Sequence, residues 1–168
     1  AGKVRHFGVS NQNPMMMELL KTAVKQPLKV NQLQLSAAFT PSFEAGFHVN
    51  MEGPKAAVRD GSVFEYCRLT DTVIQAWSVL QHGYFKGNFV GKEEFAALNH
   101  VLTDLAKKYQ VTPTAIALAW VLRYPGKMQS VIGTTKPQHV LEAGKAATVT
   151  LTRKEWYQIY LAAGNDLP

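Results

Sequence analysis

The chain has 168 residues, of which 46% are hydrophobic and 18% charged, and these values are typical of one globular domain with a sizeable core. No run approaches the ~20 apolar residues of a membrane span, and the first residues lack the apolar segment of a signal peptide, so neither a membrane protein nor a secreted one is expected. The formal net charge of +6 comes from Lys and Arg spread along the chain, which argues against a nucleic-acid partner and favours a small phosphorylated ligand.

Cysteine usage is minimal. Cys67 is the single cysteine, so no disulfide can form within the chain, and we expect a cytoplasmic protein. No Cys or His stands near it at metal-ligand spacing, so we interpret Cys67 as a buried or half-buried structural thiol and expect no metal site.

The beginning of the chain is typical of a strand, a helix and a second strand. Residues 4–10 predict a short strand, and Asn13-Pro14 indicates a helix start because asparagine caps free N–H groups and proline suits the first helical turn. Residues 28–36 predict the second strand. The helix has apolar residues at positions i, i+3, i+4, i+7 and i+8, which predict its buried face as Met16, Leu19, Leu20, Ala23 and Val24.

A long segment without clear regular structure follows. Residues 37–71 contain scattered Pro and Gly, and only a short helix around residues 62–68 is predicted there. Loops of this length are usually functional or disordered. Residues 72–80 then predict a third strand, whose composition indicates burial on both faces.

The rest of the chain is predominantly helical. Residues 95–109 carry the apolar pattern of a long amphipathic helix, and Thr112-Pro113 begins the next. Residues 128–133 predict a fourth strand, followed by a helix over residues 137–147. A capping box at residues 152–155 opens the last helix. The predicted buried face of that helix is Trp156, Ile159, Tyr160 and Ala163.

Four strands, each followed by helix, predict an α/β fold with a parallel sheet and right-handed crossovers. No linker divides the chain, so residues 1–168 are expected to form a single segment.

Polar residues lie near the ends of all four predicted strands, where parallel α/β folds bind their ligands. They are Ser10-Asn11, Asn31-Gln32, the segment from Trp77 to Gly83, and the segment from Gly133 to Pro137. The last joins a flexible turn, two hydroxyls and a cation to a helix N-terminus, which suits an anion. Each cluster has an ordinary alternative, namely a turn, a core network, a core aromatic or a capping turn. Four clusters at four successive strand ends favour a ligand site.

At these residues the sequence resembles the aldo-keto reductases. Residues 2–11 are similar to the segment of the fifth barrel strand of that family, Val30-Asn31-Gln32 to the sixth, residues 76–80 to the seventh and residues 131–137 to the eighth. The resemblance follows the order of the family and covers essentially the whole chain. It implies the C-terminal half of a (β/α)8 TIM barrel, with parallel strands and outer helices, the N-terminal half being absent.

The resemblance implies a nicotinamide cofactor, NADPH, with NADH as the alternative. Ser10, Asn11 and Gln32 would hold the nicotinamide carboxamide. Trp77 stands where the family usually stacks a Tyr on the nicotinamide ring. Ser78 and Leu80 would line the path of the pyrophosphate.

The resemblance also implies where the adenosine half of the cofactor binds. The segment that would grip the 2′-phosphate contains Gly133, Thr134, Thr135, Lys136 and His139, while Glu142 falls where the family contacts adenine. His139 replaces a usual Arg and so loses a permanent bidentate charge, and Ala143 replaces a usual Asn.

The resemblance places no catalytic residue in this chain. The family's tetrad of Asp, Tyr, Lys and His comes from strands one to four, and its Tyr protonates the carbonyl oxygen as hydride arrives. No spacing ties any candidate substitute to a Lys and an Asp, so we interpret these residues as loop or core residues: Tyr66, Tyr84, His48 and His82. Half a barrel also leaves two open strand edges and an open apolar face, so the expected partner is the missing half.

Three functional hypotheses remain. The chain is the cofactor half of an NADPH-dependent oxidoreductase for small carbonyl substrates, a non-catalytic binding or regulatory subunit on the same fold, or an unrelated half-barrel without cofactor affinity. A group of loop aromatics either shapes a substrate pocket or packs against the barrel itself: Phe39, Phe43, Phe47, Tyr84 and Phe85.

Overall fold

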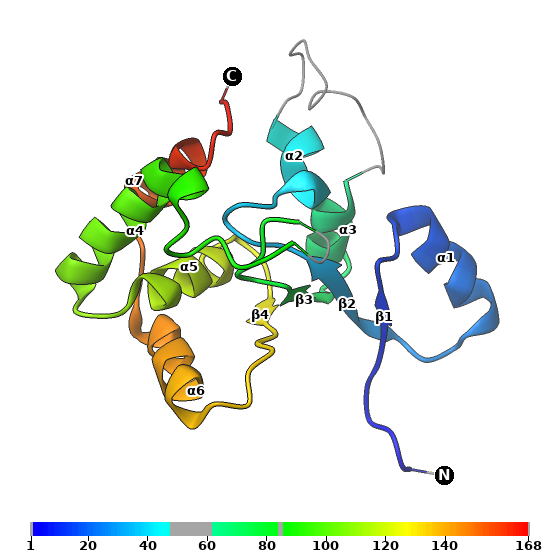
Figure 1. Cartoon of the computed structure of the whole chain (residues 1–168). Coiled ribbons are helices and arrows are strands. Elements are labelled where there is room, and N and C mark those ends of the chain that lie inside the picture. The colour runs from blue at the N-terminus through cyan, green and yellow to red at the C-terminus, as the bar shows by residue number, and fades with distance from the viewer. Residues whose placement is uncertain (1, 48–61, 84–85, 168) are drawn as a thin grey trace.

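A computed structural model describes residues 2–47, 62–83 and 86–167, with only the backbone described for residues 45–47 (Figure 1). Its centre is a sheet of four parallel strands in sequence order: β1 (Phe7–Ser10), β2 (Leu28–Gln34), β3 (Val73–Trp77) and β4 (Met128–Ser130). The helices are α1 (Pro14–Ala23), α2 (Pro41–Phe47), α3 (Val63–Leu69), α4 (Ala96–Tyr109), α5 (Pro113–Leu122), α6 (Pro137–Gly144) and α7 (Arg153–Ala162). This architecture confirms the predicted parallel α/β fold.

A short 3-10 helix, η2 (Glu93–Phe95), precedes α4, and another, η3 (Lys145–Thr148), follows α6. Every strand is shorter than predicted. β2, β3 and β4 end earlier because apolar residues continue into the turns that follow them, and β1 begins only at Phe7. The expectation of loop over residues 41–47 was wrong, since α2 begins there. Its start repeats the Thr-Pro pair that opens α5, with Thr40 before Pro41, and the Thr40 hydroxyl donates a hydrogen bond to Glu44.

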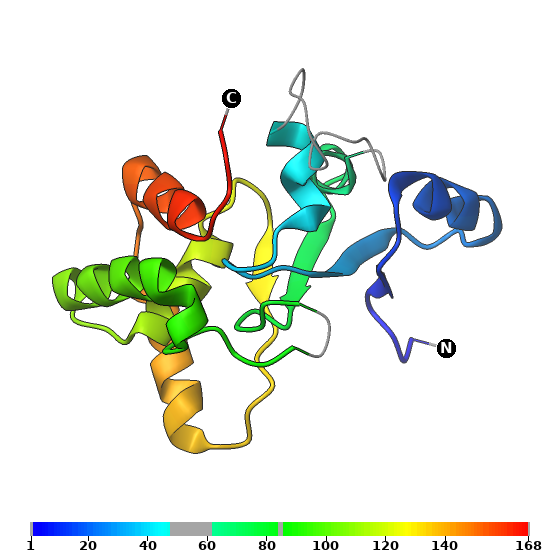
Figure 2. The same cartoon turned by 45° about the horizontal axis from the view of Figure 1, so that its top comes forward.

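The sheet is covered by helices on one face. Leu33 and Leu35 of the β2 segment and Ile74 and Ala76 of β3 are buried in one core with residues of α2, α3, α5 and α7 (Figure 2). On β3 the alternate residues are only half-buried. The prediction that this strand is buried on both faces was therefore wrong, because none of the described residues covers its second face.

Aromatic side chains dominate the core between α5 and α7. The rings of Trp120 and Trp156 stack with centroids 4.8 Å apart, and each indole N–H donates to the backbone oxygen of the other residue at 3.0 Å. Phe43 is buried against this group, 5.6 Å from the ring of Tyr124. Phe43 therefore packs against the barrel rather than into a substrate pocket.

The structure says less about the other aromatic residues of the loops. Phe39 is half-buried, and the side chain of Phe47 and residues Tyr84 and Phe85 lie outside the described part of the chain. Cys67 is fully buried, and burial raises the pKa of its thiol to about 11, which confirms the interpretation as a structural thiol.

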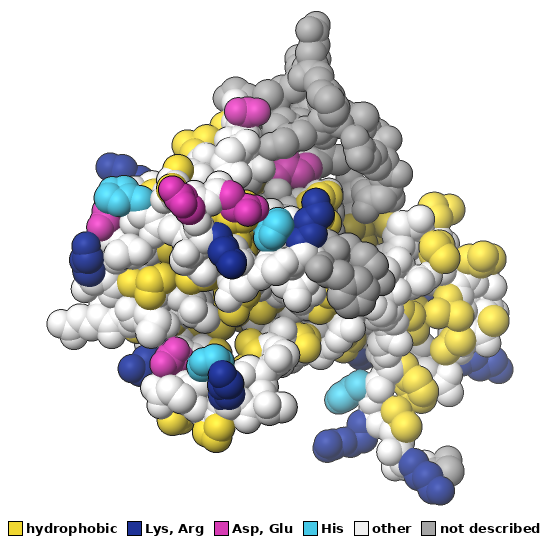
Figure 3. Space-filling model, in the orientation of Figure 1, with side chains coloured by type: hydrophobic (Ala, Val, Ile, Leu, Met, Phe, Trp, Pro, Cys, Tyr) yellow, Lys and Arg dark blue, Asp and Glu magenta, His cyan; other side chains and the backbone are white. Residues whose placement is uncertain are grey.

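The predicted buried face of α1 was wrong. Met17 is the buried residue of this helix, whereas Met16 is 49% exposed and Leu19 is 71% exposed. Together with Met15 they form a hydrophobic surface on the part of the molecule that carries α1 and β1 (Figure 3, right). The periodicity correctly indicates that this face of α1 is apolar, but the face stays exposed because no described residue covers it.

In the residues that the structure describes, no helix has the length and apolar character that a membrane crossing requires.

The predicted capping box at α7 is present and contains a buried carboxylate. Thr152 and Glu155 exchange hydrogen bonds, and Glu155 also accepts from Lys108 Nζ at 2.6 Å and from the Tyr109 hydroxyl at 2.9 Å. Burial raises the pKa of Glu155, but the hydrogen bonds from Lys108, Thr152 and Tyr109 outweigh it and hold the pKa at about 2.

A pH dependence of stability follows from this lowered pKa. The stabilisation is complete above the ordinary pKa of the group, about 4.5, and is lost as pH falls toward 2, because protonation removes the favoured carboxylate. Lys108 is largely exposed, so we expect a loss of about 2 kcal/mol rather than the full value of the shift. Urea unfolding at pH 6, 4 and 3 should show wild type losing more stability than Glu155→Gln. Parallel profiles for the two proteins would contradict the assignment.

Candidate functional site

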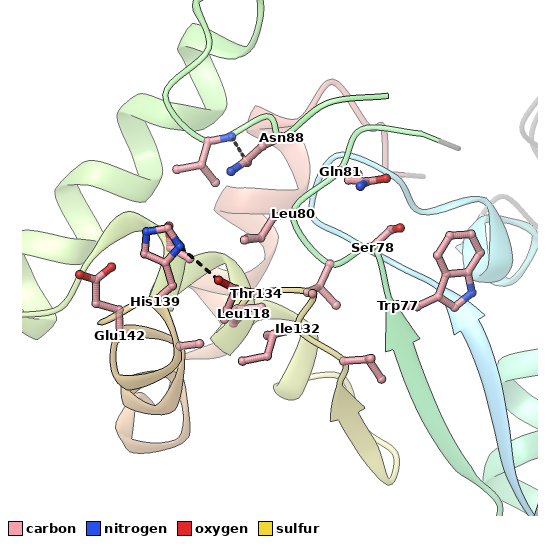
Figure 4. A pocket seen from close by; sticks show the side chains of 16 residues that line it. Trp77, Ser78, Leu80, Gln81, Asn88, Leu118, Ile132, Thr134, His139 and Glu142 are labelled. Carbon is pink, nitrogen blue, oxygen red and sulfur yellow. Dashed lines mark hydrogen bonds between the residues drawn. The ribbon is translucent and has the colours of Figure 1, made fainter. Parts of the chain in front are cut away.

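A cleft of about 600 Å³ lies at the carboxyl ends of β3 and β4 (Figure 4). Its walls come from the segments that follow these strands, from the sides of α5 and α6, and from the loop before η2. Ligands of parallel α/β folds bind at this edge. The predicted site residues that line the cleft are Trp77, Ser78, Leu80, Gly133, Thr134, His139 and Glu142.

The other predicted residues do not line the cleft: Ser10, Asn11, Gln32, Thr135 and Lys136. Ser10, Asn11 and Gln32 lie beside Trp77: its indole N–H donates to Asn11 Oδ1 at 3.4 Å, and the backbone N–H of Asn11 donates to the carbonyl of Gln32 at 2.9 Å. The Ser10 hydroxyl donates to the same carbonyl at 3.3 Å. The structure thus brings together residues that 66 positions separate in the sequence.

Backbone conformation marks the same end of the cleft. Asn11 has φ +54° and Ser78 has φ +52°, so both lie in the left-handed region at the point where a strand ends. A non-glycine residue in that region costs on the order of 1 kcal/mol, and such residues cluster at functional sites. At the first of these turns, Asn11 Oδ1 accepts the hydrogen bond from the Trp77 indole.

The side chains of Asn31 and Gln32 lie on opposite faces of the sheet. Asn31 is buried on the helix side, where its Nδ2 donates to the carbonyl of Gln12 at 2.8 Å and contacts the sulfur of Met17 at 3.5 Å. Gln32 is half-buried on the other face. The sequence left a ligand-facing role and a core network open for Gln32. The structure places Asn31 in the core network, whereas Gln32 Nε2 donates to Gln75 Oε1 at 3.4 Å on the other face.

The other end of the cleft is suited to an anion. The Thr134 hydroxyl and His139 Nδ1 lie 3.4 Å apart, and the same hydroxyl accepts from the backbone N–H of Lys136 at 3.2 Å. Lys136 occupies the N-cap position of α6 without a side-chain capping hydrogen bond, and the first turn of the helix contains no acidic residue. The exposed cation therefore stands beside a positive helix terminus. Glu142 lies one turn beyond His139 and accepts from Gln138 at 3.0 Å.

Some lining residues escaped prediction. Thr114 and Leu118 come from α5, which does not follow a strand end directly, so no local signal marks them. Gln81 lies in the polar segment after the third strand and was within reach of the pattern. Its Oε1 atom is buried and has no hydrogen-bond donor among the described residues, which leaves an acceptor for a ligand hydroxyl in the cleft wall.

Two of the candidate substitutes for a catalytic tetrad, Tyr66 and His82, do not line the cleft. Lys21 donates to the Tyr66 hydroxyl at 2.6 Å and to Glu18 at 2.7 Å, so the structure supplies the lysine partner that sequence spacing missed. This group joins α1 to α3 in the outer helical layer, away from the carboxyl ends of the strands. His82 packs against the ring of Phe95 at 4.9 Å.

The two remaining candidates, His48 and Tyr84, lie outside the described residues. Within the described ranges, no group of three or more His, Cys, Asp or Glu side chains could hold a metal ion.

Comparison with known proteins gives a consistent result. The family model described as aldo/keto reductase family matches residues 1–162. A 6-dehydroglucose reductase of Agrobacterium fabrum is 32% identical over 169 residues, which are 99% of this chain and 50% of that protein. A probable aldo-keto reductase 1 of Glycine max is 40% identical over 180 residues, with 96% of this chain and 46% of that protein covered.

Solved structures share the fold. A thermostable aldo-keto reductase in complex with the inhibitor epalrestat has a TM-score of 0.68 at 21% identity, covering 96% of this chain and 49% of that one. An aldo-keto reductase from Klebsiella pneumoniae in complex with NADPH has a TM-score of 0.66 at 19% identity, covering 94% and 48%. The chain spans about half the length of the curated relatives and of the structures that it matches.

Proposed function

The chain belongs to the aldo/keto reductase family, and we propose that residues 1–168 are the cofactor-binding half of an NADPH-dependent oxidoreductase that reduces aldehydes or ketones to alcohols. One observation carries the proposal. A single cleft runs from Trp77, with amide and hydroxyl groups beside it, to Thr134 and His139, with a cation and a helix terminus beside them (Figure 4). Its two ends differ in chemistry as the two ends of a nicotinamide dinucleotide do.

The Trp77 end fits the nicotinamide. The indole offers an aromatic face at the mouth of β3, and Ser10, Asn11 and Gln32 supply hydrogen-bonding groups for a carboxamide. A bound nicotinamide would supply the hydride for the reduction. Apolar side chains, among them Leu80, Leu118 and Ile132, line the walls between the two ends.

The α6 end fits a phosphorylated ribose. Thr134 and Lys136 present a hydroxyl and an ammonium group, and His139 adds a ring nitrogen next to Thr134. Gln81 Oε1 is placed to accept from a ribose hydroxyl between the ends. These groups favour NADPH. NADH is the alternative, because an imidazole binds a 2′-phosphate less firmly than a guanidinium does.

The complete enzyme is proposed to contain four more strands. Within the described sheet, β1 pairs only with β2 and β4 only with β3, so both outer strands present an open edge. Gln34 is buried, yet its Nε2 has no acceptor among the described residues. The missing half would close the barrel and carry the catalytic Asp, Tyr, Lys and His, so this chain alone is expected to turn over no carbonyl substrate. The buried thiol of Cys67 is compatible with a cytoplasmic protein.

The first test is a titration of the purified chain with NADPH, followed by tryptophan fluorescence, with the intact mass measured on the same sample. Trp120 and Trp156 are buried in the helical core, so quenching should arise from Trp77. Trp77→Ala should remove the quenching and weaken binding by about tenfold, since stacking on an aromatic ring contributes about 1–3 kcal/mol.

Trp77→Phe is the matched control, and it should keep most of the affinity, measured by calorimetry, while losing the fluorescence change. Quenching that survives in Trp77→Ala would place the cofactor elsewhere. Absence of binding by a chain of the correct mass would show that residues 1–168 do not hold the cofactor alone. A preceding half with an intact tetrad would support the reductase, whereas a lost tyrosine there would favour the non-catalytic subunit.

A further inference from the structure

We propose that a second pocket, formed by α3, α7 and the segment between α5 and β4, binds a small phosphate monoester that carries a hydroxyl group. Its volume of about 290 Å³ is near the lower end of the range of about 300–1,000 Å³ that is usual for ligand pockets. It is called the arginine pocket below, and its walls include Glu65, Arg68, Arg123, Tyr124, Arg153 and Tyr157.

The arginine pocket lies where β3 and β4 begin, whereas the cleft described above lies where these strands end. Arg68 stands at the end of α3 just before β3, and Arg123 and Tyr124 precede β4. The two pockets share no lining residue. A ligand in the arginine pocket is therefore additional to the cofactor proposed for the cleft.

Three of the five arginines of the chain meet at this pocket. Arg68 comes from α3, Arg123 from the C-cap of α5 and Arg153 from the first turn of α7. None of the three forms a salt bridge with a described residue. Since Glu65 is the one acidic residue of the lining, the pocket has a net charge of +2. This charge matches a phosphate monoester, which carries about −1.5 to −2 near pH 7.

Local contacts hold two of the guanidinium groups in place. Arg123 Nε donates to the carbonyl of Leu151 at 2.9 Å, and the guanidinium of Arg153 lies over the ring of Tyr157, 5.7 Å from its centroid. Neither contact occupies the terminal Nη hydrogens, so both guanidinium groups remain able to bind a phosphate in a bidentate manner.

The hydroxyl group of the ligand is inferred from Glu65. Its Oε2 atom is buried and has no hydrogen-bond donor among the described residues. Burial and the charge of Glu65 raise the pKa of Tyr124 to about 12, so this neighbouring phenol stays neutral and adds no negative charge to the pocket. A buried acceptor favours a ligand that supplies a donor, and a hydroxyl group beside the phosphate supplies one.

The test is a titration of the purified chain with glycerol 3-phosphate, followed by the NMR signals of the arginine Nε–H groups. The signals of Arg68, Arg123 and Arg153 should shift together and saturate with a dissociation constant on the order of 1 mM. The signal of Arg5, which precedes β1 and lies outside the pocket, should not move. Ethyl phosphate, which lacks the free hydroxyl groups, should bind about fivefold more weakly, the value of one hydrogen bond.

Substitutions on two different helices test whether the arginines act on one ligand. Arg68→Gln and Arg153→Gln should each weaken binding by about tenfold, because each removes a charge-assisted hydrogen bond. The matched control is Lys154→Gln, which removes the same charge from the next residue of α7, outside the pocket lining, and should weaken binding by less than about twofold. All three side chains are exposed, so the circular dichroism of the variants should equal that of wild type.

The inference is overturned if the arginine signals do not saturate, or if Lys154→Gln weakens binding as much as Arg153→Gln, which would indicate a general effect of charge. Equal affinity for glycerol 3-phosphate and ethyl phosphate would overturn the role of Glu65. Binding that is lost in Lys136→Glu but kept in Arg153→Gln would place the phosphate at α6 and also overturn the inference. Quenching of Trp77 by NADPH should be the same in wild type and Arg153→Gln, so failure of the arginine pocket would leave the proposed cofactor site standing.

Discussion

Trp156→Ala is expected to lower the free energy of unfolding by about 3–5 kcal/mol, the range for truncating a buried aromatic side chain. Trp156 is 7% exposed and stacks on Trp120 at an interplanar angle of 9°, and it also stacks on Tyr160 with ring centroids 5.7 Å apart. The substitution removes both stacks and the indole donor to the carbonyl of Trp120. That carbonyl is then left in an apolar cavity, which adds to the loss of dispersion contacts.

Urea unfolding followed by circular dichroism measures this effect, and Tyr157→Ala is the matched control. Tyr157 is the next residue of α7 but only half-buried, and it contacts Trp156 edge-on and lies beneath Arg153. Its truncation should cost less than half as much. A loss below about 1 kcal/mol for Trp156→Ala would show that the packing of α7 on α5 contributes little to the stability of the chain.

Elements with a local chemical cause could be predicted from sequence. Three helices begin at a side chain that caps the first turn, and the structure shows the hydrogen bond in each case: Asn13 to Met16, Thr112 to Ala115 and Thr152 to Glu155. A cap needs only residues three positions apart, so its signal is complete in a short window. The same holds for α4, whose apolar periodicity is matched by the burial of Leu98, Leu102 and Leu105.

Features that depend on distant residues could not be predicted in the same way. Periodicity correctly marks α1 as apolar on one side, but burial of that side requires a covering element, and Met16 and Leu19 are exposed. The contact between Lys21 and Tyr66 joins residues 45 positions apart and has no local sign. The prediction that β3 is buried on both faces was wrong for the same reason. The composition of a strand shows that it can be buried on both faces, but it does not show which elements cover it.

The cleft shows the same division. Ser78, Thr134 and His139 follow strand ends, so topology alone brings them to one edge of the sheet. Thr114 and Leu118 line the cleft because α5 packs beside β4, and this packing is a feature of the tertiary structure. Gln32 was singled out in the sequence as a polar residue in an apolar strand, whereas its pairing with Gln75, and that of Gln75 with Gln129, depends on the strand register.

Lys136→Glu is expected to weaken NADPH binding by about 100-fold, or about 3 kcal/mol, while leaving NADH binding nearly unchanged. The ammonium group of Lys136 is exposed at the start of α6, and its backbone N–H is held by the Thr134 hydroxyl, so the side chain is available to a 2′-phosphate beside Thr134. Reversing its charge replaces an attraction by a repulsion at short range. A glutamate there is compatible with the positive end of the helix, so the fold should be retained.

The control for Lys136→Glu is Lys145→Glu, which makes the same change of charge at an exposed position just after α6. It should shift both affinities only slightly, through the long-range field that salt screens. His139→Arg should act in the opposite direction and strengthen NADPH binding by about tenfold, because a guanidinium is permanently charged and binds phosphate in a bidentate manner. Equal weakening of NADPH and NADH by Lys136→Glu would show that this lysine contacts the pyrophosphate instead, and the 2′-phosphate would then have to bind at another part of the cleft.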